Sequence, residues 1–297
     1  MSPPVPLPPA GAHGGDGVAV ARALGLDPSS LLDLSQNMNP AAPPVADLVT
    51  RHLDALGRYP DTGPATTYLA QALEVDPQRL LLTNGGSEAI HLVTQVLGGR
   101  VRSEPEFGLH PRGESGPTWR TDPHSPSGRL AGQDEHADVW DEAFYALATG
   151  RWTARRPGVV VGSLTKTFNC PGLRLGYVVA DPHLIAACAR AQAHWSVSTL
   201  ALAVLPDLLD LADLPAWSAT IATLRAQLLD LCSGHGLRVE AADAPWVLVH
   251  EPGLRERLAP HGVLVRDCAS FGMPGVARIA VPDAAGMERL ATALDSS

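Results

Sequence analysis

The sequence has few basic residues, few cysteines and no long apolar segment, and each shortage excludes a class of protein. Its 22 basic residues face 31 acidic ones, and the net charge of -9 argues against general binding of nucleic acid. No apolar run is long enough to cross a membrane, so we expect a cytoplasmic protein without a membrane partner. The 4 cysteines are widely spaced without a CxxC pair, which argues against a disulfide scaffold or a metal site.

The order of apolar patterns along the 297 residues predicts an α/β protein with one large or two unequal domains. Residues 1–10 are half proline and lack the pattern of a signal peptide, so we expect a flexible tail. Strand-like runs such as 80–83 and 159–161 alternate with helical patterns, which predicts a mostly parallel sheet covered by helices. Helical patterns follow, with breaks expected at Pro206 and Pro215, and then short strands alternate with helices in a smaller domain.

Lys166 is the only lysine in the chain, since the other 21 of the 22 basic residues are arginines. An amine can lose its proton and attack a carbonyl, whereas a guanidinium essentially cannot. The residue follows the apolar run 159–161 and a Gly-Ser turn, so it lies near the end of a predicted strand. It is therefore a candidate covalent nucleophile. The alternative is a surface lysine that escaped a bias toward arginine, and the count alone does not decide between the two.

Three other strand-like segments end in residues that could act together with Lys166. A Gly-Gly-Ser turn at 85–87 opens a helix, an arrangement that presents backbone N–H groups to an anion. Phe107 and Asp141 follow two further segments, and the carboxyl ends of parallel strands meet at one edge of a sheet. An amine, a carboxylate, an anion cradle and a flat ring match the needs of pyridoxal phosphate. Singly, Phe107 could be a core residue, Asp141 a helix cap and the turn a helix start, so only their conjunction indicates a site.

The sequence resembles the aspartate-aminotransferase-like superfamily of fold-type I pyridoxal-phosphate enzymes over nearly its whole length, from His13 to Ile279. The most specific motifs are Ser-Leu-Thr-Lys, then Pro-Gly-Leu-Arg-Leu-Gly-Tyr, and Asp-Glu-Ala-Phe, which together lie within 141–177. His-Gly-Gly, Ser-x-Asn-x-Asn-Pro and Arg-Tyr-Pro-Asp, within 13–61, resemble the threonine-phosphate decarboxylases of the cobalamin pathway. The histidinol-phosphate aminotransferases are near relatives of that branch.

The resemblance implies a three-layer α/β fold with a mostly parallel central sheet and a smaller α/β C-terminal domain. The large domain, which binds the cofactor, would span residues 36–204. The small domain would combine residues 11–35 with residues 205–297. The resemblance also implies a homodimer in which each active site is shared between the two subunits.

The resemblance further assigns roles to individual residues. Lys166 would bind the aldehyde of pyridoxal 5'-phosphate and then carry a proton, while Asp141 would keep the pyridine nitrogen protonated. The other cofactor contacts would be Phe107 on the ring, Gly86, Ser87, Ser163 and Arg174 on the phosphate, and Tyr59 from the second subunit. The substrate phosphate would be bound by His13, Asn37 and Arg266, and Arg278 would bind the substrate carboxylate or share the phosphate.

The sequence departs from the pattern of the family in two places. Ser125 stands where the family has an asparagine that bonds the ring oxygen of the cofactor, and the shorter side chain would reach that oxygen only through water. The segments 107–122 and 128–137 are short, which would remove a helix beside the sheet. Phe144 stands where aminotransferases commonly have a tyrosine, which agrees better with the decarboxylase branch.

The resemblance therefore favours decarboxylation of L-threonine O-3-phosphate to 1-aminopropan-2-yl phosphate in cobalamin biosynthesis. Two arginines, Arg266 and Arg278, suit a doubly charged phosphorylated amino acid because a guanidinium binds carboxylate or phosphate in a bidentate manner. One alternative is transamination of histidinol phosphate or a related amino acid. The orientation of the substrate relative to the cofactor ring decides which bond to the α-carbon breaks, and the sequence does not reveal this orientation. A second alternative is a catalytically weakened relative that binds a small phosphate ester, against which the single retained lysine argues.

Overall fold

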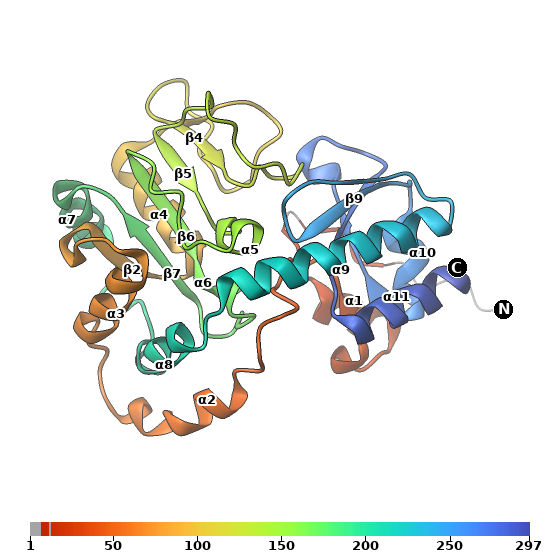
Figure 1. Cartoon of the computed structure of the whole chain (residues 1–297), viewed down its shortest axis with the longest axis horizontal. Coiled ribbons are helices and arrows are strands. Elements are labelled where there is room, and N and C mark those ends of the chain that lie inside the picture. Colours follow the sequence, from red (N-terminus) through yellow and green to blue (C-terminus); the bar gives the residue numbers. More distant parts are fainter. Residues whose placement is uncertain (1–6, 12) are drawn as a thin grey trace.

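The computed structural model describes residues 7–11 and 13–297, which form a larger and a smaller part (Figure 1). Most of the tail expected at residues 1–10 lies outside the described residues. No helix in the described part of the chain is long and apolar enough to cross a membrane.

A six-stranded sheet in the order β2-β7-β6-β5-β4-β3 organises the larger part. The strands are β2 (Leu80–Asn84), β3 (Arg100–Val101), β4 (Thr118–Thr121), β5 (Val139–Asp141), β6 (Val159–Ser163) and β7 (Leu175–Val179). β3, β4, β5 and β6 pair in parallel, whereas β7 runs antiparallel to both of its neighbours. Every residue of β5 and β6 is buried, as expected for central strands covered on both faces. The predicted mostly parallel sheet is confirmed.

Helices cover both faces of this sheet, which makes the predicted three layers. They are α4 (Gly85–Leu97) and α7 (Pro182–Ala191) on one face, and α3 (Gly63–Leu73), α5 (Tyr145–Thr149) and α8 (Thr199–Asp210) on the other. Successive residues of a strand point to opposite faces. In β6, Val160 therefore packs in the cluster that contains Leu69 of α3, while Val161 packs in the cluster that contains Ile90 of α4.

A four-stranded antiparallel sheet with helices forms the smaller part. Its strands are β8 (Val239–Ala241), β9 (Trp246–His250), β11 (Arg266–Asp267) and β12 (Val276–Ala280), and its helices include α10 (Leu254–Leu258) and α11 (Ala284–Asp295). The helix α9 (Leu214–Gly234) connects the two parts (Figure 1), because Trp217 packs in the core of the larger part and Leu228 in that of the smaller.

The N-terminal segment lies with the C-terminal part of the chain. β1 (Leu32–Asp33) pairs in parallel with β10 (Val263–Leu264), and Val20 of α1 (Gly17–Leu24) packs in one cluster with Leu264. The proposed domain boundaries, 36–204 against 11–35 with 205–297, stay a prediction, with which this pairing agrees. Two short helices complete the larger part, α2 (Ala46–Arg51) and α6 (Leu164–Thr167).

The connections between the parallel strands β3, β4 and β5 contain no helix, as the short segments predicted. Parallel strands are usually joined through a helix. The connections 102–117 and 122–138 are therefore unusual in having none. The prediction of a helix break at Pro206 is wrong, because this proline lies inside α8. Its neighbours Leu205 and Leu208 are fully buried, and their packing outweighs the hydrogen bond that proline cannot donate. Pro215 lies in the first turn of α9, where a break was expected.

Candidate active site

A cavity of about 260 Å³ lies at the carboxyl ends of the parallel strands and reaches the smaller part of the molecule. All predicted site residues except Tyr59 line it: His13, Asn37, Gly86, Ser87, Phe107, Ser125, Asp141, Ser163, Lys166, Arg174, Arg266 and Arg278. Tyr59 is 78% exposed and packs against the Trp195 ring at a tilt of 37°, and its role in a second subunit stays a prediction. A larger cavity of about 440 Å³ beside Tyr145 contains none of the predicted residues.

Lys166 occupies the short helix α6, directly after the carboxyl end of β6. Burial lowers the pKa of its amine from 10.5 to about 8, and the positive charges of Arg278, Arg174 and Arg266 act in the same direction. The backbone N–H of Asn39 donates to the Lys166 carbonyl at 3.1 Å, which helps to fix the loop. The lysine is therefore an amine that becomes neutral at mildly alkaline pH, as a nucleophile requires.

The first turn of α4 forms a concave surface together with Ser163 and Arg174. Gly85 begins the helix with a φ of +76°, and a Cβ there would lie 2.6 Å from the Arg174 guanidinium. A Cβ on Gly86 would lie 3.2 Å from the Cβ of Ser163. Gly86, Ser87 and Arg174 line the same cavity, and the free N–H groups and positive dipole end of a helix N-terminus favour an anion beside a guanidinium. This cradle fits a phosphate group.

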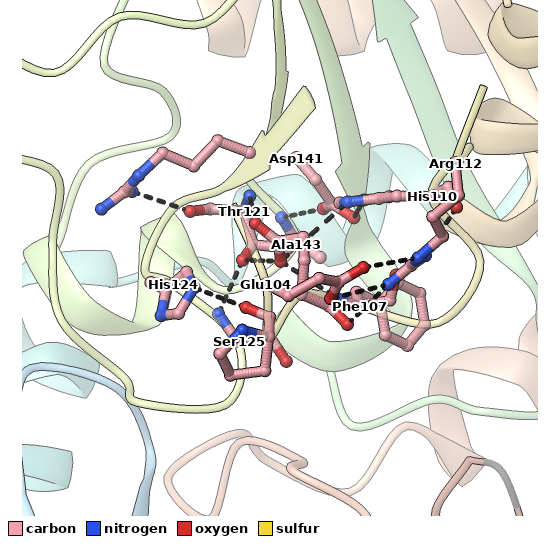
Figure 2. A network of polar contacts seen from close by, with 12 residues as sticks. Glu104, Phe107, His110, Arg112, Thr121, His124, Ser125, Asp141 and Ala143 are labelled. Atoms are coloured by element: carbon pink, nitrogen blue, oxygen red, sulfur yellow. Dashed lines mark hydrogen bonds and ion pairs between the residues drawn. The ribbon is translucent and has the colours of Figure 1, made fainter. Parts of the chain in front are cut away.

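Asp141 ends β5 with only 5% of its surface exposed. Its Oδ2 lies 3.0 Å from His110 Nε2, and its Oδ1 accepts a hydrogen bond from the Ala143 N–H at 3.0 Å (Figure 2). Because an ionised carboxylate only accepts hydrogen bonds, His110 Nε2 is the donor in this pair. The sequence did not identify His110, which lies three residues after Phe107 in a loop without a periodic pattern. Its buried imidazole fixes the carboxylate that faces the cavity.

The aromatic ring and the serine predicted to contact the cofactor come from the two connections that lack helices. The Phe107 ring is half-buried, with its centroid 5.4 Å from that of His13 and 5.7 Å from that of His110. The Ser125 backbone N–H donates to Thr121 Oγ1 at 2.6 Å, which fixes the turn. Thr121 lines the cavity too, although no sequence motif had indicated it. The contacts of Phe107 and Ser125 with a cofactor stay predictions.

Two arginines face each other on the side of the cavity formed by the smaller part. Arg266 on β11 pairs in register with Arg278 on β12, and they are 5% and 6% exposed. Burial and the charge of Arg266 lower the pKa of Arg278 to about 9. The Asn37 amide lies 3.0 Å from Arg278 Nη2 and 3.3 Å from Nε, in the orientation in which its oxygen accepts both bonds. Like charges directly opposite destabilise a strand pair, so an anion in the cavity would stabilise this arrangement.

Comparison with known proteins shows the class to which this fold and site belong. Residues 121–294 match the aminotransferase class I and II family. The chain is 32% identical to the threonine-phosphate decarboxylase of Salmonella typhimurium, over 95% of each protein. It is 26% identical to histidinol-phosphate aminotransferase 2 of Pseudomonas aeruginosa, over 88% of each. The structure of histidinol-phosphate aminotransferase from Sinorhizobium meliloti in complex with pyridoxal-5'-phosphate matches with a TM-score of 0.78 at 17% identity, over 94% of each chain.

The chain therefore belongs to the aminotransferase class I and II family and is an enzyme with pyridoxal 5'-phosphate as its cofactor. The family resemblance and the fold class read from the sequence are both confirmed. The alignment with the Salmonella typhimurium protein extends over 353 positions, more than the 297 residues of this chain. This chain thus lacks segments that the relative has, in agreement with the helix-free connections on either side of β4.

Proposed function

We propose that this protein decarboxylates L-threonine O-3-phosphate to 1-aminopropan-2-yl phosphate, a step of cobalamin biosynthesis in the cytoplasm. The observation that carries this proposal is the pair of buried guanidiniums, Arg266 and Arg278, which border the same cavity as Lys166. A substrate with both a phosphate and a carboxylate offers one anionic group to each arginine. The similarity to the Salmonella typhimurium decarboxylase supports the same reaction.

Some residues of the site would bind the substrate, and others would hold or transfer protons. Pyridoxal phosphate, when bound, supplies a sink for the electron pair that a broken bond leaves on the α-carbon. Asp141, whose carboxylate is buried, would hold a proton at the pyridine nitrogen. Lys166, whose pKa near 8 leaves it largely protonated at neutral pH, would deliver a proton to the α-carbon once carbon dioxide has left.

Orientation of the substrate decides which bond breaks. Arg278, with the amide of Asn37 against it, would bind the carboxylate, and Arg266 would bind the phosphate together with His13. Burial and the charge of Arg266 lower the pKa of His13, which makes this histidine a neutral hydrogen-bonding group near neutral pH. Two fixed anionic groups leave the α-carbon little freedom to rotate, so the bond to the carboxylate can be held perpendicular to the cofactor ring.

The second candidate is transamination of histidinol phosphate or a related amino acid, which the similarity to the Pseudomonas aeruginosa aminotransferase supports. Phe144 lines the cavity and packs edge-on against Trp246, with ring centroids 5.0 Å apart. It carries no hydroxyl group that could bond the cofactor, which agrees better with a decarboxylase. The third candidate, a weakened relative that only binds a phosphate ester, does not account for the buried amine of Lys166.

We infer that the enzyme works as a homodimer with a shared active site. Tyr59 and Trp195 pack against each other with tilted rings and 4.8 Å between the ring centroids, although they are 78% and 62% exposed. Leu53 and Leu56 add further exposed apolar surface, at 49% and 65%. Large exposed apolar side chains are typical of protein interfaces. A second copy seated here would cover them and bring Tyr59 toward the partner's cofactor.

The variant Arg266→Ala tests the proposed phosphate site. We expect kcat/KM for L-threonine O-3-phosphate to fall about 30- to 4000-fold, because truncating one partner of a buried charge contact costs about 2–5 kcal/mol. For unphosphorylated L-threonine, kcat/KM should change by less than about threefold, as that substrate lacks the group in question. The matched control is Arg238→Ala, an arginine of the smaller part whose side chain is 74% exposed. Equal losses for both substrates would reject the assignment.

A further inference from the structure

Glu106 is a buried carboxylate directly before the predicted stacking ring, and no motif of the sequence had indicated it. Its residue surface is 3% exposed. Oε1 accepts hydrogen bonds from the Phe107 N–H at 2.9 Å and from Thr121 Oγ1 at 2.6 Å, while Oε2 accepts one from the Thr121 N–H at 3.0 Å. One carboxylate thus joins the loop after β3 to the end of β4.

The hydrogen bonds continue from Glu106 to the turn that carries Ser125. Thr121 Oγ1 donates to Glu106 and accepts from the Ser125 N–H at 2.6 Å, so the carboxylate fixes this turn through one hydroxyl group. Arg112 fastens the other side of the loop after β3: its guanidinium donates to the carbonyl groups of Glu106, Phe107 and His110 at 3.1, 2.9 and 2.6 Å (Figure 2). These bonds hold two connections that contain no helix.

Glu106 also faces the imidazole that binds Asp141. His110 Nε2 lies 3.0 Å from Asp141 Oδ2, and His110 Nδ1 lies 4.0 Å from Glu106 Oε1. The side chains of Glu106 and His110 are 1% and 0% exposed, so water does not screen this contact. The imidazole therefore lies between two carboxylates: it is hydrogen-bonded to Asp141, whereas Glu106, at 4.0 Å from Nδ1, makes no hydrogen bond to it and acts on it only through its charge.

We propose that Glu106 is a positioning residue for the cofactor ring. Its carboxylate sets three elements at once: the Phe107 ring, the Ser125 turn and, through His110, the Asp141 carboxylate. Each element follows a different parallel strand, β3, β4 and β5. The connections between these strands contain no helices, and this one buried carboxylate aligns the three elements with one another. The proposal rests on the assignment of Phe107 and Asp141 to the cofactor ring.

The variant Glu106→Gln removes the charge and inserts an amide nitrogen among donors. Both carboxylate oxygens accept a backbone N–H, so in either orientation the new NH₂ group opposes a donor. The probe is pyridoxal 5'-phosphate added to cofactor-free protein, followed by the visible absorbance band and by the circular dichroism of the bound cofactor. We expect the dissociation constant to rise about tenfold or more, because a buried polar group left unsatisfied is costly. The circular dichroism per bound cofactor should fall, and kcat should decrease by a larger factor than KM changes.

Two further variants separate positioning from mere stability. Glu114→Gln, in the same loop with an exposed side chain, should leave all of these values unchanged. Thr121→Val keeps the shape of a strand residue but breaks the link to Ser125, and should shift the circular dichroism in the same direction even if Glu106→Gln does not fold. A lower melting temperature with an unchanged dissociation constant and unchanged circular dichroism would overturn the proposal. Failure of the unaltered protein to bind the cofactor would instead overturn the site assignment beneath it.

Discussion

The variant Lys166→Arg is expected to fold, to lose covalent binding of pyridoxal phosphate and to lose turnover. The guanidinium keeps the positive charge of the side chain but cannot give up a proton to attack an aldehyde or to pass a proton to the substrate. Loss of the proton carrier alone should lower kcat by about 10²- to 10⁴-fold. The visible absorbance band of the lysine-bound cofactor reports binding, and thermal unfolding reports whether the variant folds.

The chain offers an unusual control for this prediction because it has one lysine only. The double variant Lys166→Arg, Arg190→Lys returns one lysine at an exposed position of α7, and it should remain without the absorbance band. In the unaltered protein, the rate of band formation should rise with pH through about 8, since the amine becomes neutral above its lowered pKa. A band in the double variant, or a midpoint near the ordinary lysine value of 10.5, would contradict the account.

The variant Asp141→Asn is expected to bind the cofactor and to lower kcat by about 10²- to 10³-fold, the usual cost of removing one preorganised electrostatic contact. The amide keeps the shape of the side chain: its oxygen can accept from the Ala143 N–H while its NH₂ group donates to His110 Nε2, with the imidazole proton then on Nδ1. It carries no charge to hold a proton at the pyridine nitrogen, so the cofactor withdraws electrons less effectively. Steady-state kinetics gives kcat, and the visible band confirms that the cofactor is present.

Asp138→Asn provides the control for this variant at the opposite end of β5. Asp138 is exposed and caps Thr118 with hydrogen bonds of 2.8 Å from the backbone N–H and from the hydroxyl group. Its replacement should leave kcat within about twofold, as is usual for surface substitutions remote from a site. Full activity of Asp141→Asn would show that another group protonates the cofactor ring.

The parts of the site that follow regular strands were readable from the sequence, and the structure places them together. Lys166 stood out by its count, and the Gly-Gly-Ser turn stood out because a strand-to-helix junction presents N–H groups to an anion. Both features can be recognised within a single segment of the sequence, because neither depends on contacts with distant residues. Arg266 and Arg278 were found through the resemblance alone, because their register across two short strands is a tertiary feature.

The polar groups beneath the cavity could not be predicted from the residues. Glu106 and His110 lie in a loop, and their partners are up to 31 positions away in the sequence. A buried polar network has no periodicity, so no pattern marks it. β4 was not predicted for a related reason: it has four residues and lies in a region rich in proline and glycine.

The measurement that tests the proposed function most directly is product analysis with L-threonine O-3-phosphate labelled in its carboxylate. We expect the cofactor-loaded enzyme to release the label as carbon dioxide and to form 1-aminopropan-2-yl phosphate in equal amount. A parallel reaction with histidinol phosphate and 2-oxoglutarate should yield no glutamate. Transfer of the amino group in that second reaction, with no labelled carbon dioxide in the first, would contradict the account and identify the enzyme as an aminotransferase.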